Sequence, residues 1–442
     1  MRTPEVLKAM HGQTAPDHGT APTRDLPLLH LIQLSVYWFG ISIIWGGLDG
    51  AIIPFRLEQA YPDDFGLRFA IISGAAVIMA ILVQPTVGII SDYSITRWGR
   101  RKPFIVIGAL LDVVFLIGIA ASQDFLVLLV FMVLLQFSSN FAQGPFQGYV
   151  PDLVPAKQVG LASGLMGLML MLGRIAGVGI GTLGIVTDSL WIATVALGVV
   201  EVATMIVLVR SVHEGTAAPP RPGTWWQVAR SAWGADVLRE RNVLWLLLVR
   251  LLFLGAIAST SLGIAYFGRT HGLDRDAAAG TLFIGTIIVG VTTAAAAIPG
   301  GKLSDRYGRK PMIYLACVVA AIGMAGVALA PSPALAIAAF VPFGLGAGIF
   351  LSVDWALMTD VIPKETTGRY MGILNAGTAA AGPVYLVVAG LTLDAFSRVE
   401  LGLGPRAAMM VAAGFLLLAG VALTRVDPRR RELEAPLVPA AA

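Results

Sequence analysis

The stretch SDYSITRWGRRKP at residues 91–103 and the stretch GGKLSDRYGRKP at residues 300–311 decide the fold of this chain. Both end in Arg-Lys-Pro, which begins at Arg101 in the first stretch and at Arg309, 208 residues later, in the second. The same offset relates a second set of residues, in which Asp152, Pro155, Gly160 and Gly164 return as Asp360, Pro363, Gly368 and Gly372. The chain therefore contains an internal repeat and is predicted to fold as two related halves.

The composition around these stretches is that of a membrane protein. Of 442 residues, 56% are hydrophobic and only 13% are charged, whereas about 25% of residues are charged in soluble domains. A helix needs about 20 mostly apolar residues to cross a bilayer. We find twelve such runs, at residues 29–55, 69–91, 103–121, 125–150, 159–186, 190–209, 243–267, 277–303, 312–330, 334–358, 370–393 and 407–424.

The predicted fold is an all-α membrane protein with twelve transmembrane helices in two six-helix halves. Each repeated motif follows an even number of apolar runs, so the halves share one orientation, as in a parallel repeat. The predicted divisions are a disordered cytoplasmic tail (1–27), an N-terminal bundle (28–210), a linker with an amphipathic interface helix (211–242), a C-terminal bundle (243–426) and a C-terminal tail (427–442).

The basic residues predict the orientation. With both termini in the cytoplasm, the inner segments hold 23 of the 31 Lys and Arg residues, and such residues accumulate on the cytoplasmic side. Basic cytoplasmic loops therefore explain the net charge of +4, and nucleic-acid binding is not needed to explain it. We expect a multi-pass protein of the plasma membrane or the bacterial inner membrane. The single cysteine, Cys317, excludes a disulfide framework, and no cofactor or metal site is predicted.

The two repeated loops are predicted to form a cytoplasmic latch. Glycine permits a tight turn, and an aspartate at a helix end can face basic side chains or the N-terminus of another helix. A purely topological basic loop is the alternative. The latch residues are Asp92, Gly99, Arg100 and Arg101 in the first loop and Asp305, Arg306, Gly308 and Arg309 in the second.

Two polar stripes predict a solute site. Trp38, Ser42, Trp45 and Asp49 are spaced 4, 3, 4 along the first helix, and Gln136, Asn140, Gln143 and Gln147 repeat this spacing along the fourth. Each set lies on one helical face, which must face the protein interior or a cavity because polar groups are costly in lipid. Hydrogen bonding between helices is the alternative. With Asn375 and Tyr385 of the eleventh helix, these residues favour a solute with many hydroxyl groups.

Charged residues within the predicted spans are candidates for proton coupling. A charge in the middle of a bilayer costs at least about 2.5 kcal/mol, so it indicates a function by default. An acid without a basic partner can carry a proton. Asp49 and Asp354 could instead lie at aqueous helix ends. The charges within the spans are Asp49, Asp112, Arg174, Glu201, Arg250 and Asp354.

These motifs resemble known families. The second loop is similar to the signature loop of the major facilitator superfamily, and VQPTVGIISDYSITRWGRRKPFIVIG (83–108) and NFAQGPFQGYVPDL (140–153) resemble plant sucrose-proton symporters and their relatives. The resemblance implies that Asp152 matches an essential aspartate, with Asn140 and Gln143 in the substrate path. A structural salt bridge to Arg101 or Lys102 is the alternative for Asp152. We predict that Asp152 and Asp112 are the proton carriers and that Arg174 is the counter-charge of the carboxylate.

Several positions depart from the sucrose symporters. Gln147 stands where they have Arg, Arg174 lies in Gly-Arg-Ile-Ala-Gly where Gly-Asn-Ile-Leu-Gly is expected, and the seventh helix lacks their cluster of charges. Sodium symporters of the melibiose type, glycoside-pentoside-hexuronide cation symporters, are more distantly similar. Their sodium-binding aspartates correspond to Ala80 and Gln84 here, which favours protons over sodium.

We therefore expect a secondary active transporter that works as a monomer and carries a sugar or glycoside together with protons by alternating access. One alternative is a proton-driven exporter of small apolar compounds, which would need a mainly apolar cavity. Another is a non-transporting membrane assembly factor, which would lose the latch. No nucleophile with a His base is apparent, so an enzyme is not predicted.

Overall fold

The computed structural model describes residues 25–94, 96–155, 158–212, 214, 224–226, 240–361 and 367–427. Most of these residues are helical, and the described part contains no strand beyond an isolated bridge between Thr96 and Gly99. Twelve helices are long and apolar enough to cross a membrane, which confirms the predicted fold class. Most of the two predicted tails and most of the predicted interface helix lie outside the described residues.

The helices of the N-terminal half follow the predicted spans within a few residues. Its first span is interrupted, since α2 (Leu28–Gly47) continues through a π-helical turn, η1 (Leu48–Ile52), into α3 (Ile53–Ala60). The other elements are η2 (Pro62–Asp64), α4 (Phe65–Asp92), α5 (Lys102–Ala121), α6 (Phe125–Gln147), α7 (Tyr149–Leu153), α8 (Val159–Val186) and α9 (Leu190–Ser211).

The C-terminal half repeats this plan. Its first span is also irregular, since α11 (Arg241–Ile257) is followed by a 3-10 segment, η5 (Ala258–Leu262), then α12 (Gly263–Ala265) and a π segment, η6 (Tyr266–Thr270). The remaining helices are α13 (Arg275–Tyr307), α14 (Arg309–Leu329), α15 (Pro333–Val361), α16 (Thr367–Ser397) and α17 (Leu403–Leu423).

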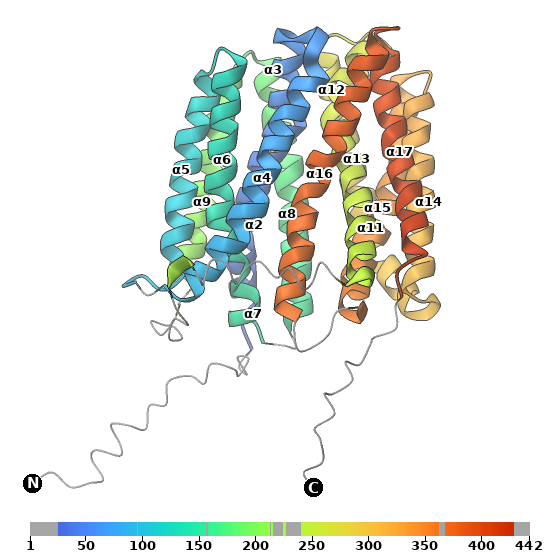
Figure 1. Cartoon of the computed structure of the whole chain (residues 1–442). Coiled ribbons are helices and arrows are strands. Elements are labelled where there is room, and N and C mark those ends of the chain that lie inside the picture. The colour runs from blue at the N-terminus through green and yellow to red at the C-terminus, as the bar shows by residue number, and fades with distance from the viewer. Residues whose placement is uncertain are drawn as a thin grey trace, which may run out of the picture.

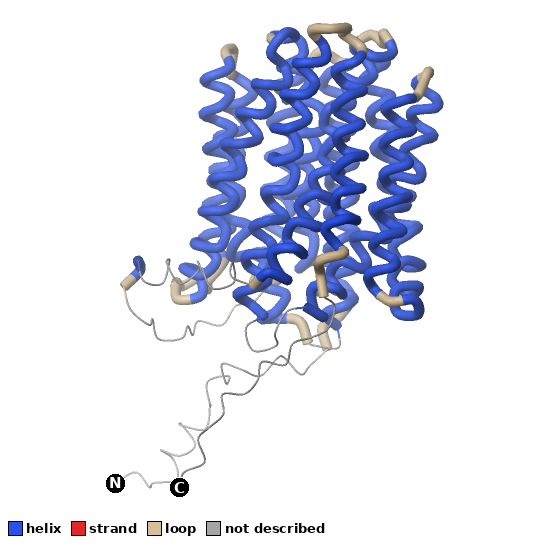
Figure 2. The backbone as a smooth tube through the Cα atoms, turned by 45° about the vertical axis from the view of Figure 1, so that its right-hand side comes forward, coloured by secondary structure: helices blue, strands red, loops and turns tan. Residues whose placement is uncertain are grey.

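The two halves stand side by side as helical bundles (Figures 1 and 2). In the N-terminal half, α2 packs on α8 and α9, and α5 packs on α6 and α9. In the C-terminal half, α14 packs on α15 and α17, and α13 packs on α15. The halves meet where α4 contacts α16 and where α8 contacts α13. A space between the halves is therefore bounded mainly by these four helices and by the irregular first spans.

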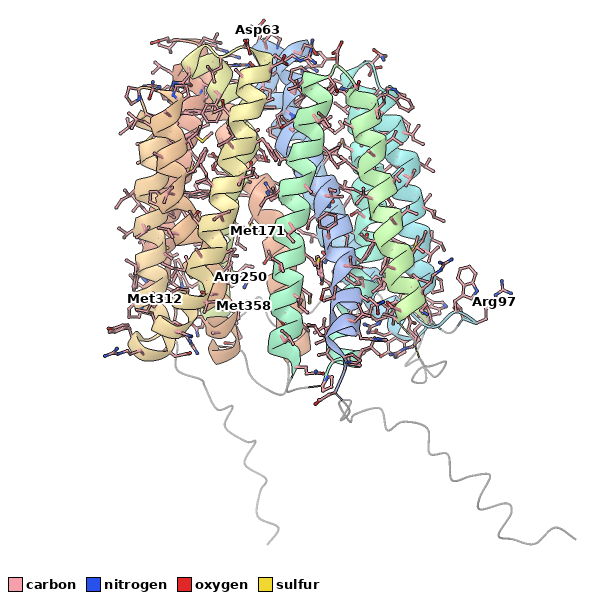
Figure 3. The ribbon with its side chains drawn as sticks, turned by 180° about the vertical axis from the view of Figure 1, so that it is seen from behind. Asp63, Arg97, Met171, Arg250, Met312 and Met358 are labelled. Atoms are coloured by element: carbon pink, nitrogen blue, oxygen red, sulfur yellow. The ribbon has the colours of Figure 1, made fainter. Side chains whose placement is uncertain are left out.

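Asp63 and Arg97 mark the opposite ends of the bundle (Figure 3). We call the end that carries the two repeated loops the motif side and the other end the far side. The ion pairs and hydrogen bonds between the two halves lie mainly on the far side. Arg269 binds Glu58 with Nε 2.5 Å from Oε1, and Arg275 binds Asp188 with Nη2 3.0 Å from Oδ1. The structure is therefore closed on the far side.

The far-side closure also depends on a close crossing of α4 and α16. The backbones of Gly66 and Gly390 touch there, and a Cβ atom at either position would collide with the backbone of the other. Next to this crossing, the carboxylate of Asp394 on α16 accepts hydrogen bonds from the backbone N–H groups of Gly66 (2.8 Å) and Leu67 (2.6 Å) at the start of α4. A negative charge is favourable at a helix N-terminus, so this contact ties the two halves together.

Candidate functional site

A cavity lies between the two halves, with lining residues from both. One wall comes from the N-terminal half and contains charged and polar groups, whereas the other comes from the C-terminal half and is mainly apolar. The first wall is formed by Asp49, Ile72, Ser73, Ala76, Met132, Gln136 and Arg174. The second is formed by Leu254, Ile257, Ala258, Ser261, Gly382, Pro383 and Leu386. The cavity is thus two-faced, with both of its charges on one wall.

Asp49 reaches the cavity because the first span loses its regular α geometry there. It lies in η1, and such π-helical turns inside helices are frequent at functional sites. The backbone just before it packs tightly on α8, since a Cβ atom at Gly46 would collide with the backbone of Arg174 and one at Gly177 with the backbone of Ile43. This packing holds Asp49 and Arg174 on neighbouring helices in the same wall.

Asp49 and Arg174 attract each other electrostatically, although no direct ion pair within 4.0 Å joins these two described residues. Arg174 also reaches across the cavity, where its Nη2 donates a hydrogen bond of 3.4 Å to the hydroxyl of Thr260 on η5. Its guanidinium therefore connects the two halves at the level of the cavity. Arg174 lies beside Asp49 and not beside Asp112, the partner that the sequence suggested.

The predicted solute-binding residues only partly reach this cavity. Gln136 lines it, and the Nδ2 of Asn140 donates to the carbonyl oxygen (2.7 Å) and the side-chain oxygen (2.9 Å) of Gln136 from a buried position behind it. These two amides therefore act as one hydrogen-bonded unit. Gln143 and Gln147, one and two turns further along α6, are half-buried and do not line the cavity.

The predicted aromatic and C-terminal solute residues lie elsewhere. Trp38 is buried against Phe146, with ring centroids 5.3 Å apart, and Trp45 packs against the hydrophobic core. Ser42 is buried next to Gly173 of α8. Tyr385 is fully buried and donates to the carbonyl oxygen of Ala408 at 2.8 Å. The side chain of Asn375 lies outside the described part of the structure.

The predicted coupling residues Arg250 and Asp354 form a buried ion pair inside the C-terminal half. Nη1 of Arg250 lies 2.5 Å from Oδ2 of Asp354, and the two side chains are 2% and 3% exposed. The same guanidinium donates to the hydroxyl of Thr378 at 2.8 Å and contacts the sulfur of Met358, which lies close to it in Figure 3. The pair joins α11, α15 and α16 and does not line the cavity.

The predicted latch of the N-terminal half forms a compact charge network. Arg101 binds Asp92 (Nη2 to Oδ1, 2.7 Å) and Asp152 (Nη2 to Oδ2, 3.0 Å), and Arg100 also binds Asp152 at 3.0 Å. The turn that presents these arginines requires a left-handed backbone at Gly99, where φ is +115°. Asp152 therefore lies in the latch on the motif side and pairs with basic side chains.

The start of the linker belongs to this network. The carboxylate of Glu214 accepts hydrogen bonds from the backbone N–H groups of Arg101 (2.8 Å) and Lys102 (3.0 Å), and the hydroxyl of Tyr149 donates to it. Burial and the neighbouring Glu214 carboxylate raise the pKa of Tyr149 above its ordinary value. Glu214 thus caps the N-terminus of α5 and anchors the beginning of the linker on the latch.

The latch of the C-terminal half is simpler and more exposed. Arg309 binds Asp305 one turn earlier, with Nη1 2.6 Å from Oδ1, and the Asp305 side chain is 69% exposed. Gly308 makes the turn between α13 and α14 with a φ of +93°, and Arg306 is exposed next to the ring of Tyr307. The side chain of Asp360, the repeat partner of Asp152, lies outside the described residues.

Sequence reasoning missed Ser73, Ser261 and the apolar wall. A single serine gives no periodic signal, but the repeat offset holds a clue, because Asp49 and Arg174 correspond at 208 residues to Ile257 and Gly382. All four residues line the cavity. Equivalent positions of the two halves therefore face each other, with charges in one half and small or apolar groups in the other.

Twelve spans, two bundles related by a repeat and a central two-faced cavity define a polytopic transporter of small molecules, and not an enzyme. The sequence profile described as Major Facilitator Superfamily matches residues 32–353 and, in an overlapping second match, residues 283–441. The chain belongs to this superfamily. Among solved structures, a nucleoside transporter, NupG, superposes with a TM-score of 0.72 at 12% identity, over 90% of this chain and 99% of that one.

Curated relatives confirm the resemblance to sucrose transporters. The rice sucrose transport protein SUT1 (Oryza sativa subsp. japonica) is 27% identical over 167 residues, and the human proton-associated sugar transporter A is 32% identical over 136 residues. The multi-drug resistance efflux pump PmrA of Streptococcus pneumoniae is 31% identical over 121 residues. These matches cover 32%, 27% and 27% of this chain and 31%, 18% and 28% of the three relatives, respectively.

Proposed function

We propose that the chain is a proton-coupled symporter of a sugar or another hydroxyl-rich solute, with its motif side in the cytoplasm. The observation that carries the proposal is the two-faced cavity, in which Asp49, Gln136 and Arg174 oppose Leu254, Ile257 and Leu386. A sugar presents hydroxyl groups at its edge and carbon–hydrogen faces above and below its ring. Such a solute matches a pocket with a few convergent polar groups on one side and an apolar surface on the other.

In this proposal Arg174 and Gln136 bind the solute hydroxyls, and Asp49 is the proton carrier. A coupling carboxylate must be protonated in one half of the cycle and ionised in the other. Asp49 is suited to this role because its nearest opposite charge, Arg174, attracts it from outside ion-pair distance and also bonds across the cavity to Thr260. Movement of the halves would break the bond to Thr260 and change the distance between the two charges.

Asp152 is the weaker candidate for the carrier. In the described structure it is shared by Arg100 and Arg101 on the motif side, so its bonds stabilise the latch. Sugar relatives support the substrate class, but their matched stretches are short. With the motif side in the cytoplasm, the far-side closure makes this the inward-facing state, in which solute leaves toward the cytoplasm.

A second candidate function is export of amphipathic compounds. The apolar C-terminal wall would accept such molecules, and the likeness to an efflux pump points the same way. The polar wall distinguishes the two functions, because a site built for hydrogen bonding rejects molecules that leave its buried groups unpaired.

Purified protein in liposomes tests both functions. We expect a labelled sugar from a panel of mono- and disaccharides to accumulate only when a pH gradient, acidic on the far side, is imposed. Gln136→Leu, which keeps the approximate size of the side chain and removes its hydrogen bonds, should reduce this accumulation. Gradient-driven movement of an amphipathic dye, with no sugar of the panel accumulated, would replace symport by export.

A further inference from the structure

Two carboxyl groups face each other behind the cavity, inside the N-terminal half. Asp112 lies on α5 and Glu201 on α9, and both side chains are 0% exposed. Neither residue lines the cavity between the halves. The two helices pack directly on each other, and α5 also packs on α6 while α9 packs on α2. The carboxyl groups thus sit where four helices of one bundle meet.

Among the described residues, the polar side chains that bond to this pair are hydroxyl groups. Tyr37 on α2 donates a hydrogen bond of 3.2 Å to Oε1 of Glu201, and Ser138 on α6 donates to Oδ1 of Asp112. The titratable groups that face the pair from the packed helices are each other and Tyr37. Among the described residues, no Lys or Arg forms an ion pair with either acid, and Arg174 belongs to the cavity.

The remaining two oxygen atoms define the chemistry of the site. Oδ2 of Asp112 and Oε2 of Glu201 are buried and receive no hydrogen bond from a donor of the described residues. The two carboxyl groups come from helices that pack on each other, and they are close enough to interact electrostatically. Two carboxylates cannot bond without a hydrogen, and two negative charges in contact inside a membrane protein repel each other strongly. One proton shared by the pair would supply the missing hydrogen bond and remove one of the two charges.

We propose that Asp112 and Glu201 form a proton-binding site in which the two carboxyl groups share a single proton at neutral pH. The remaining negative charge is stabilised by the hydroxyl groups of Tyr37 on α2, which leads into the η1 turn of Asp49, and of Ser138 on α6, which also bears Gln136. The shared proton therefore fixes α2 and α6 on their scaffold helices. Neither acid lines the cavity, so this proton-binding site does not depend on the identity of the solute.

Infrared difference spectroscopy of the protein in liposomes tests the proposal. At pH 7 we expect an absorption band of a protonated carboxyl group that shifts when H₂O is exchanged for D₂O. Asp112→Asn and Glu201→Gln each replace one acid with an amide that can donate to the remaining carboxylate, so the proton is no longer needed. Each variant should lose this band component completely, whereas Asp63→Asn, at an exposed position, should keep it.

Two outcomes would overturn the shared proton. One is a band component that persists unchanged in both amide variants. The other is the absence of any protonated-carboxyl band in the unmodified protein at pH 7, which is informative even if a variant does not fold. Carboxyl-¹³C aspartate or glutamate incorporated into the unmodified protein should shift the band and show, without a substitution, whether an aspartate or a glutamate contributes to it. The infrared measurement does not depend on sugar accumulation, so its outcome can be distinguished from a failure of the proposed symport.

Discussion

Arg269 closes the far side of the protein by binding Glu58 through two of its guanidinium nitrogen atoms. Nε lies 2.5 Å from Oε1 and Nη2 lies 2.7 Å from Oε2, and Nη2 also donates to the carbonyl oxygen of Pro62 at 2.7 Å. The Arg269 side chain is 5% exposed, and it belongs to the C-terminal half, whereas both partners belong to the N-terminal half. Such paired hydrogen bonds between charged groups are geometrically specific and stronger than those of neutral groups.

Loss of this pair should favour the state that is open on the far side. Hydrogen bonds to charged groups contribute about 1.5–3 kcal/mol, so Glu58→Gln should raise the population of that state roughly tenfold or more. The only cysteine, Cys317, is buried, so Ser73→Cys introduces one reporter thiol in the cavity wall. The rate of its reaction with a membrane-impermeant reagent added from the far side measures the opening.

The matched control for this experiment is Arg68→Gln. Arg68 and Asp64 also form a far-side ion pair, but the pair lies within one half and its atoms are 3.7 Å apart. Surface pairs at this separation contribute about 0–1 kcal/mol. An equal increase in labelling for Arg68→Gln and Glu58→Gln would show that the bond between the halves has no special role.

Asp394 should act on the same equilibrium through a helix terminus. Its carboxylate caps α4 through Gly66 and Leu67, and loss of a helix cap costs about 1 kcal/mol. Asp394→Ala should therefore increase far-side labelling of the Ser73→Cys reporter about fivefold. Asp394→Asn keeps one acceptor oxygen and should have a smaller effect, and a larger effect of the asparagine variant would contradict the capping role.

The sequence predicted those features that repeat or that are rare in membrane helices. The offset of 208 residues between the Arg-Lys-Pro motifs predicted the two halves, and single charges among apolar residues identified Asp49 and Arg174. The pairing of charged side chains could not be predicted in this way, because it depends on which helices face each other. The sequence suggested Arg174 as the counter-charge of Asp112, and only the packing of α5 on α9 shows that Glu201 lies next to it instead.

Helical spacing also could not distinguish a cavity face from a packed face. Trp38 and Gln136 both lie on predicted polar stripes, yet Trp38 packs on Phe146 while Gln136 lines the cavity. Both faces look toward the protein interior, so the same cost of exposure to lipid explains both patterns. Ser73 and Ser261 escaped notice because a lone serine costs little in a membrane helix, where it can bond to its own backbone.

The two latches should differ in strength. Asp92 is 41% exposed and pairs with Arg101, which is 7% exposed and shared with Asp152, whereas Asp305 is 69% exposed and pairs within one turn of helix with Arg309, which is 27% exposed. Asp92→Asn should slow transport roughly tenfold, and Asp305→Asn about twofold or less. Initial rates at saturating solute, compared with equilibrium binding of the same solute, separate slower movement from lost binding. Equal rates in the two variants would rule out this asymmetry.

The Arg250–Asp354 pair should be needed for the stability of the C-terminal half. Removal of one partner of a buried ion pair leaves an uncompensated charge and costs about 3–5 kcal/mol. Asp354→Asn should therefore lower the thermal unfolding temperature in detergent far more than Asp276→Asn, whose surface pair with Arg275 spans 3.7 Å and whose side chain is 59% exposed. Replacement of both Arg250 and Asp354 by apolar residues should recover part of the loss. Unchanged unfolding in Asp354→Asn would indicate that the pair is not stabilising.

Asp49 should couple solute movement to the proton gradient. Asparagine at this position keeps the shape of the side chain but cannot exchange a proton, so Asp49→Asn should lose gradient-driven accumulation. The variant should still exchange internal for external solute within about threefold of the parental rate, because Gln136 and Arg174 remain in the wall of the cavity.

Arg174→Lys should retain part of the coupling, since it keeps the positive charge next to Asp49 but not the planar donor group that reaches Thr260. Counterflow and pH-gradient uptake are measured on the same liposomes, with Asp63→Asn as the control at an exposed site. Normal accumulation in Asp49→Asn, or loss of exchange together with accumulation, would remove Asp49 from the role of proton carrier.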